Sequence, residues 1–84
     1  MTYQIVFERI AVKALEKIPL FTRQKIIETI EELSENPRPQ GSIKLQSRAG
    51  YRIRIGDYRV IYHINDKQIT ILILDIGHRR EIYN

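Results

Sequence analysis

Three arginines stand at alternating positions on either side of a Gly-Asp pair, in the stretch from residue 50 to residue 62. Arg52 and Arg54 precede Gly56-Asp57, and Arg59 follows it. A guanidinium group fits phosphate better than any other side chain, and it stays protonated at all ordinary pH values. These residues can therefore stabilise negative charge but are poor at moving protons. They indicate either an anion site or the solvated outer face of a sheet.

The Gly56-Asp57 pair is typical of a tight two-residue turn of type II′ between antiparallel strands. This turn sets Arg54 opposite Arg59, because residues at equal distances from the turn form a pair. Cross-strand partners share one face of the sheet. One face then carries Tyr51, Ile53, Ile55, Tyr58, Val60 and Tyr62, and it predicts a core face. The other, called the arginine face below, carries Arg52, Arg54, Arg59, Ile61 and His63.

The charge distribution is uneven along the chain. The 84 residues carry a formal net charge of +4. Acidic residues concentrate in residues 28–35, whereas residues 38–59 contain a single acid, Asp57. The basic residues of that second stretch are Arg38, Lys44, Arg48, Arg52, Arg54 and Arg59. The resulting local positive potential favours a polyanionic partner, either nucleic acid or an acidic protein.

Composition limits the remaining possibilities. The length suits one domain, residues 1–84, with one modest core. There is no cysteine, no run long enough for a membrane span and no signal-peptide pattern at the start, so we expect a soluble cytoplasmic protein. His63 and His78 do not form a metal-ligand set, and the serines do not suggest a Ser-His-Asp site. We expect neither a metal nor a cofactor.

The order of the predicted elements defines the fold class. Residues 3–7 predict a strand, and residues 8–18 predict a helix that ends at Pro19. A second helix follows, with Thr22 as a possible N-cap, and ends by Asn36. Two joined amphipathic helices form an antiparallel helix hairpin. Ile10, Ala11, Ala14, Leu15 and Ile18 form the apolar stripe of the first helix, and Ile26, Ile27, Ile30 and Leu33 that of the second.

The second half of the chain predicts strands. Residues 43–45 form a short strand, the arginine hairpin ends near residue 64, and residues 68–76 read as a central strand. We therefore predict an α+β fold: an N-terminal strand, and a helix hairpin packed on one face of a twisted, mainly antiparallel sheet of about four to five strands. Asp75 is an acid in an apolar run. An arginine partner is the favoured explanation, and a catalytic role stays open.

Three stretches resemble the RelE/ParE toxin superfamily of bacterial toxin–antitoxin systems. They are Glu35-Asn36-Pro37-Arg38-Pro39, residues 50–62 and Gly77-His-Arg-Arg-Glu-Ile-Tyr83. Length and element order also match, so the resemblance covers essentially the whole chain and implies the RelE-like fold. RelE-like members are ribosome-dependent mRNA endonucleases, whereas ParE-like members inhibit DNA gyrase and lack the nuclease residues.

The resemblance implies a basic catalytic patch. Its basic residues fall on Arg52, Arg54, Arg59 and Arg79, and its tyrosine falls on Tyr83. Some members have lysines where this chain has Arg52 and Arg54, a change that keeps charge but alters proton chemistry. Tyr83 is the favoured base for the RNA 2′-OH, and His78 is the competing acid–base candidate. Lys44, Arg48 and Arg80 are expected to bind RNA.

Two other functions stay open. The chain could bind gyrase as ParE-like members do, although such a protein contact has no need of three arginines together with Tyr83. The arginines could instead pair mainly with an acidic segment of a partner. In either branch the resemblance implies a cognate antitoxin, bound through a helix or strand on the basic or helical surfaces in a hetero-oligomer.

Overall fold

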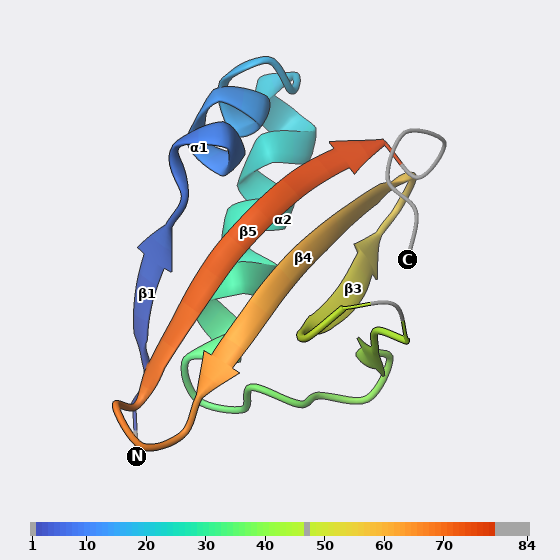
Figure 1. Cartoon of the computed structure of the whole chain (residues 1–84). Helices are drawn as coiled ribbons and strands as arrows, with labels where there is room; N and C mark the ends of the chain where they lie inside the picture. The colour runs from blue at the N-terminus through green and yellow to red at the C-terminus, as the bar shows by residue number, and fades with distance from the viewer. Residues whose placement is uncertain (1, 47, 79–84) are drawn as a thin grey trace.

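A five-stranded mixed sheet forms the centre of the molecule (Figure 1). The computed structural model describes residues 2–46 and 48–78. The strands are β1 (Gln4–Phe7), β2 (Ile43–Lys44), β3 (Tyr51–Ile55), β4 (Tyr58–Asn65) and β5 (Thr70–His78). Their order in the sheet is β1-β5-β4-β3-β2. All neighbouring pairs are antiparallel except β1 and β5, which are parallel.

Two helices, α1 (Arg9–Glu16) and α2 (Leu20–Leu33), cover one face of this sheet. In Figure 1, α2 passes behind β4 and β5, while the opposite face is turned toward the viewer. This arrangement confirms the predicted α+β class and the side on which the helices pack. No helix within the described ranges is long and apolar enough to cross a membrane.

The core lies between the helices and the face of the sheet that they cover. Tyr62, Val60 and Ile73 are completely buried there, together with Ile26 and Leu33 of α2. The predicted core face of the hairpin is therefore confirmed. The tyrosine hydroxyl that this packing buries is satisfied, because Tyr62 donates a hydrogen bond of 2.8 Å to the carbonyl of Pro37.

Two details of the predicted helices are wrong. Helix α2 begins at Leu20, with Pro19 rather than Thr22 in the N-cap position. Proline suits a helix start, since its fixed φ and missing N–H cost nothing there. The guanidinium of Arg23 meanwhile donates to the carbonyls of Glu16 and Ile18 at the end of α1. Ile10, expected on the buried stripe of α1, is 59% exposed.

The hairpin has the predicted register. Arg54 pairs with Arg59 and Ile53 with Val60 across β3 and β4. Gly56 has φ of 59°, and Asp57 is not among the described residues with positive φ. A type I′ turn needs positive φ at both central residues, so the turn is type II′ as predicted.

Strand β5 contains a β-bulge that the sequence pattern does not predict. Ile61 of β4 pairs with Asp75, but the next residue, Tyr62, pairs with Ile73. Leu74 is therefore an extra residue on β5. Buried side chains alternate up to Ile73 and resume at Ile76, one position out of phase. Two neighbouring residues of β5 thus turn toward the face away from the helices.

Candidate functional site

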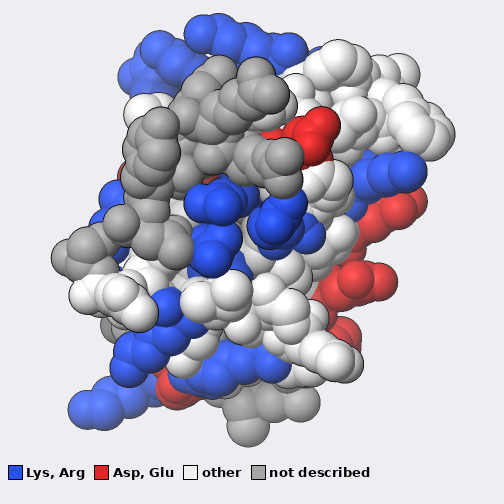
Figure 2. Space-filling view, turned by 90° about the vertical axis from the view of Figure 1, so that its right-hand side faces the viewer, with Lys and Arg blue, Asp and Glu red and all other residues white. Residues whose placement is uncertain are grey.

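The arginine face is the face of the sheet that the helices leave uncovered. Arg52 and Arg54 lie on β3, and Arg59 lies on β4. Arg54 and Arg59 are direct cross-strand partners, a like-charge pairing that destabilises a sheet. Figure 2, seen from the β3 side, shows basic side chains gathered near the middle of the surface and acidic ones toward its right-hand side. The arrangement concentrates positive charge at the cost of some sheet stability.

A small second core supports this face. Ile61 is fully buried although it lies on the arginine face, because Leu45 and Leu74 pack on it. The loop that carries Leu45 folds close to the sheet at Gly50, where a Cβ atom would lie 2.8 Å from the carbonyl oxygen of Tyr62. Sequence reasoning missed this cluster, since the loop between β2 and β3 gives no periodic signal. The cluster packs the loop after β2 against β4 and β5 on the arginine face.

The side chain of Arg52 is half-buried. Its Nε atom is buried and has no hydrogen-bond partner within the described ranges. A buried donor without a partner is costly unless a ligand supplies an acceptor. A phosphate oxygen is an acceptor of the required kind.

The predicted site residues do not all lie on the arginine face. His78 pairs with Tyr58, and the two rings meet edge to face at 5.6 Å on the face that the helices cover. Lys44 pairs with Tyr51 and therefore shares that same face at the sheet edge. Arg48 is exposed in the loop before β3. The predicted residues Arg79, Arg80 and Tyr83 lie outside the described residues.

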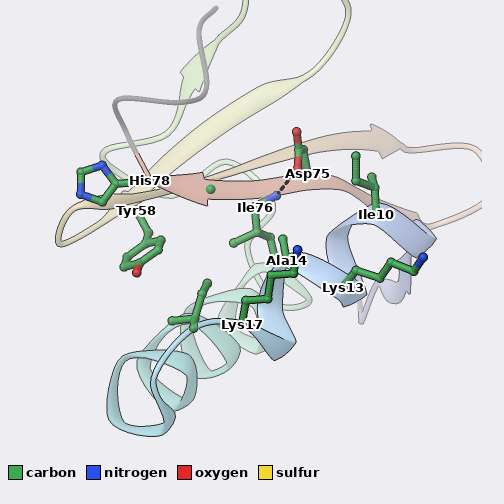
Figure 3. A pocket seen from close by; sticks show the side chains of 10 residues that line it. Ile10, Lys13, Ala14, Lys17, Tyr58, Asp75, Ile76 and His78 are labelled. Carbon is green, nitrogen blue, oxygen red and sulfur yellow. Dashed lines mark hydrogen bonds between the residues drawn. The ribbon is translucent and has the colours of Figure 1, made fainter.

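Asp75 lies on the arginine face because of the bulge. Its carboxylate accepts a hydrogen bond of 2.8 Å from the amide of Ile76. Among the described residues no arginine forms an ion pair with Asp75, and the predicted arginine partner stays a prediction because Arg79 and Arg80 lie outside the described residues. Figure 3 shows the carboxylate on the opposite side of β5 from Tyr58 and Ile76.

A groove of about 530 Å³ lies on the other side of β5, against α1. Lys13 of α1 and Lys17, directly after that helix, border it, with Tyr58, Ile76 and His78 across from them (Figure 3). The three arginines do not line this groove, but Asp75 does, where β5 extends beyond the end of β1. Among the described residues, no three His, Cys, Asp or Glu side chains gather in a group that could hold a metal ion.

The family model described as "ParE toxin of type II toxin-antitoxin system, parDE" matches residues 5–83. The chain belongs to this family, within the RelE/ParE toxin superfamily. It is a toxin of the type II toxin–antitoxin class.

Curated relatives and solved structures agree with this assignment. The chain is 33% identical to toxin RelG of Mycobacterium tuberculosis, over 99% of this chain and 98% of RelG. It is 26% identical to mRNA interferase toxin RelE of Escherichia coli K12, over 100% of this chain and 93% of RelE. The structure matches a chain of the RelBE2 complex of M. tuberculosis with a TM-score of 0.82 and 30% identity, covering 94% of this chain and 100% of that one. A chain of the archaeal RelE–RelB complex of Pyrococcus horikoshii matches with a TM-score of 0.81 and 32% identity, covering 98% and 100%.

Proposed function

We propose that this toxin is a ribosome-dependent endoribonuclease that cuts mRNA by attack of a ribose 2′-OH on the neighbouring phosphodiester. The observation that carries the proposal is the convergence of Arg52, Arg54 and Arg59 on the uncovered face of the sheet. The curated name of the E. coli relative, mRNA interferase, supports the same activity.

The arginine face supplies charge stabilisation. During the attack, negative charge develops on the phosphorane oxygens, and preorganised guanidinium groups stabilise it more than they stabilise the starting phosphodiester. Arg52 contributes a buried Nε donor to such a ligand. By resemblance, Arg79 adds a fourth positive charge. The reaction is assigned to these side chains rather than to a metal bound by the protein.

The three arginines add little proton-transfer capacity, which fits a need for the ribosome. Arginine stays protonated, so it is a poor base. The ribosome would hold the mRNA in the attack geometry, and orientation alone supplies a large part of a barrier. Tyr83 stays the acid–base residue that the resemblance implies. His78, the competing candidate, lies with Tyr58 on the opposite face of the sheet.

The partner of this toxin is a cognate antitoxin with which it forms a hetero-oligomer in the cytoplasm. Several of the similar solved structures are toxin–antitoxin complexes, which supports the proposal. A basic face and a lysine-bordered groove favour an antitoxin segment rich in acidic residues.

The deciding experiment is primer extension on an mRNA in a translating extract. Wild type is expected to cut within codons, and Arg59→Ala is expected to lower cutting by about 100- to 1000-fold. The same mRNA without ribosomes is expected to stay intact, and efficient cutting of bare RNA would contradict ribosome dependence.

A second function, inhibition of DNA gyrase, is favoured by one observation: the matching family model is described as a ParE toxin. Folded wild type that cuts no mRNA but blocks supercoiling by purified gyrase would establish this alternative. A protein-binding surface does not require three arginines on one sheet face, so the nuclease is the function that the geometry supports best.

A further inference from the structure

The β-bulge of β5 changes the face toward which Asp75 points. In a regular strand, side chains alternate, so Asp75 would share the helix-covered face with Ile71 and Ile73. With Leu74 inserted as an extra residue, Asp75 instead pairs with Ile61 on the arginine face. A strand would not need a bulge to bury another apolar residue, and bulges frequently re-aim a side chain beside an active site.

The position of Asp75 relative to Arg59 follows from the register. Arg59 pairs with Gly77, and Ile61 pairs with Asp75. Asp75 and Arg59 are therefore diagonal neighbours on one face, with Cα atoms separated by roughly 7 to 8 Å in such pairs. Gly77, the cross-strand partner of Arg59, has no side chain that would lie between Arg59 and Asp75. Among the strand residues that the structure describes, Asp75 is the one carboxylate on the arginine face.

The carboxylate is oriented and reachable. The amide of Ile76 donates to its Oδ1 atom at 2.8 Å, and this bond fixes the direction of the side chain. Asp75 is only partly buried and also borders the groove beside α1, so its carboxylate is accessible from the edge of β5. A group held by a backbone hydrogen bond is preorganised and needs no rearrangement when substrate arrives.

A negative charge among arginines restricts which atoms of an RNA can lie beside it. A phosphate would be repelled, so the fitting groups are hydrogen-bond donors. The 2′-OH is the donor that every ribonucleotide carries, and it lies next to the phosphate that it attacks. When Arg59 binds that phosphate, the diagonal position of Asp75 suits the neighbouring hydroxyl.

We propose that Asp75, in place of the Tyr83 that the resemblance implies, is the proton acceptor for the attacking ribose 2′-OH. This proposal rests on the endoribonuclease function proposed above. The carboxylate takes the proton of the hydroxyl as the 2′-oxygen forms a bond to phosphorus. The bond from phosphorus to the 5′-oxygen breaks, and the 5′-oxygen takes a proton from water. The products are a 2′,3′-cyclic phosphate and a 5′-hydroxyl, and the carboxylic acid then returns its proton to solvent.

The competing explanation is structural, because the same carboxylate satisfies an amide next to the bulge. Asp75→Asn separates the two roles. An asparagine oxygen still accepts from the Ile76 amide, but it cannot take a proton from a hydroxyl. Asp57→Asn is the matched control, with the same charge change in the exposed hairpin turn.

The experiment compares these proteins by primer extension on ribosome-bound mRNA, with thermal unfolding as a check on folding. We expect Asp75→Asn to lower the cleavage rate by about 100- to 10,000-fold, the range for loss of a general base, with an unchanged unfolding temperature. We expect Asp57→Asn to cleave like wild type. Asp75→Ala is expected to regain activity in added acetate and less in formate, the weaker base, and none in chloride at equal ionic strength.

The outcomes distinguish this proposal from the function on which it rests. Cleavage by wild type together with full activity of Asp75→Asn overturns the role of Asp75 and leaves the nuclease standing. Loss of activity in Asp75→Ala without rescue by either carboxylate also overturns it. Absence of cleavage by folded wild type overturns both proposals.

Discussion

At the scale of single residues, the same side-chain type serves different purposes at different positions. Tyr62 is completely buried and donates to the carbonyl of Pro37, whereas Tyr51 accepts from Arg38 at an exposed position. Arg52, Arg54 and Arg59 lie on the uncovered face, where they raise the local potential instead of contributing to packing. The environment of each residue, rather than its type, decides whether it stabilises the fold or serves the site.

The buried hydrogen bond of Tyr62 gives the first prediction. Tyr62→Phe leaves the Pro37 carbonyl without this donor, so we expect a loss of about 1 to 3 kcal/mol in the free energy of unfolding. Urea denaturation measures it. The control is Tyr51→Phe, which removes an exposed bond and should change stability less. Equal losses in the two variants would show that burial of the Tyr62 hydroxyl is unimportant.

The second prediction concerns Arg54, which is exposed and therefore costs little stability when replaced. Arg54→Ala is expected to lower mRNA cleavage by about 100- to 1000-fold, because one preorganised donor to the phosphorane is lost. Arg9→Ala, the same change in the first turn of α1, should leave cleavage unaltered. A comparable drop in both variants would indicate that only total charge matters.

At the scale of elements, the loop between β2 and β3 depends on one glycine. Gly50 has φ of +124°, and its Cα lies against the backbone of Tyr62. This close approach lets Leu45 cover Ile61, and the amide of Leu45 donates to the Gly50 carbonyl at 3.0 Å. The loop therefore packs against β4 and β5 on the arginine face.

Replacement of this glycine tests the close approach. Gly50→Ala adds a Cβ at 2.8 Å from the Tyr62 carbonyl oxygen and also strains φ. Gly41→Ala, at φ of +98°, meets nothing within 4 Å, so it carries the strain alone. Such strain costs about 1 to 3 kcal/mol, and we expect Gly50→Ala to be the more destabilising variant in urea denaturation. A larger effect at Gly41 would contradict the role of the contact.

At the scale of the whole molecule, a polar network joins segments that are distant in sequence. Asp66, in the turn between β4 and β5, accepts from the hydroxyl of Tyr3 at 2.7 Å and pairs with Arg38 at 2.9 Å. Arg38 belongs to the loop after α2 and also donates to Tyr51. The hydrogen bond from Arg38, followed by that from Tyr3, lowers the pKa of Asp66.

This lowered pKa predicts the direction of a pH effect. A group whose folded-state pKa is depressed stabilises the fold above its unfolded pKa, about 3.9, and loses that contribution as the pH falls through the folded value. Wild type should therefore exceed Asp66→Asn in urea midpoint at neutral pH, and the difference should shrink below about pH 4. The difference is expected to be small because the pair is exposed. A difference that grows in acid would contradict the assignment.

The basic face predicts a salt-dependent affinity for RNA. Each phosphate contact to single-stranded nucleic acid contributes a slope of about −0.7 in the logarithm of affinity against the logarithm of salt concentration. An uncleavable 2′-deoxy oligonucleotide in a fluorescence titration provides the measurement. Arg54→Gln should make the slope shallower by about one such increment, and Lys67→Gln, in the turn after β4, should not change it. An unchanged slope for Arg54→Gln would place the nucleic acid elsewhere.

Local sequence patterns were sufficient to predict the helices, the strands and the hairpin. Strict alternation around Gly56-Asp57 sets the register, since a shift by one residue would move every apolar side chain to the wrong face. Spacings of three and four give the helices, and the resemblance gives the family. The register and the helices depend on residues that are close together in the sequence, so the sequence pattern predicts them.

Which residues lie together on the arginine face depends on tertiary contacts. The bulge at Leu74 depends on how β5 pairs with β4, and without it Asp75 would point into the core. The burial of Ile61 depends on a loop that crosses the sheet, and the position of His78 opposite the arginines depends on its pairing with Tyr58. Contacts between residues far apart in the chain determine all three, and a pattern within one strand does not contain them.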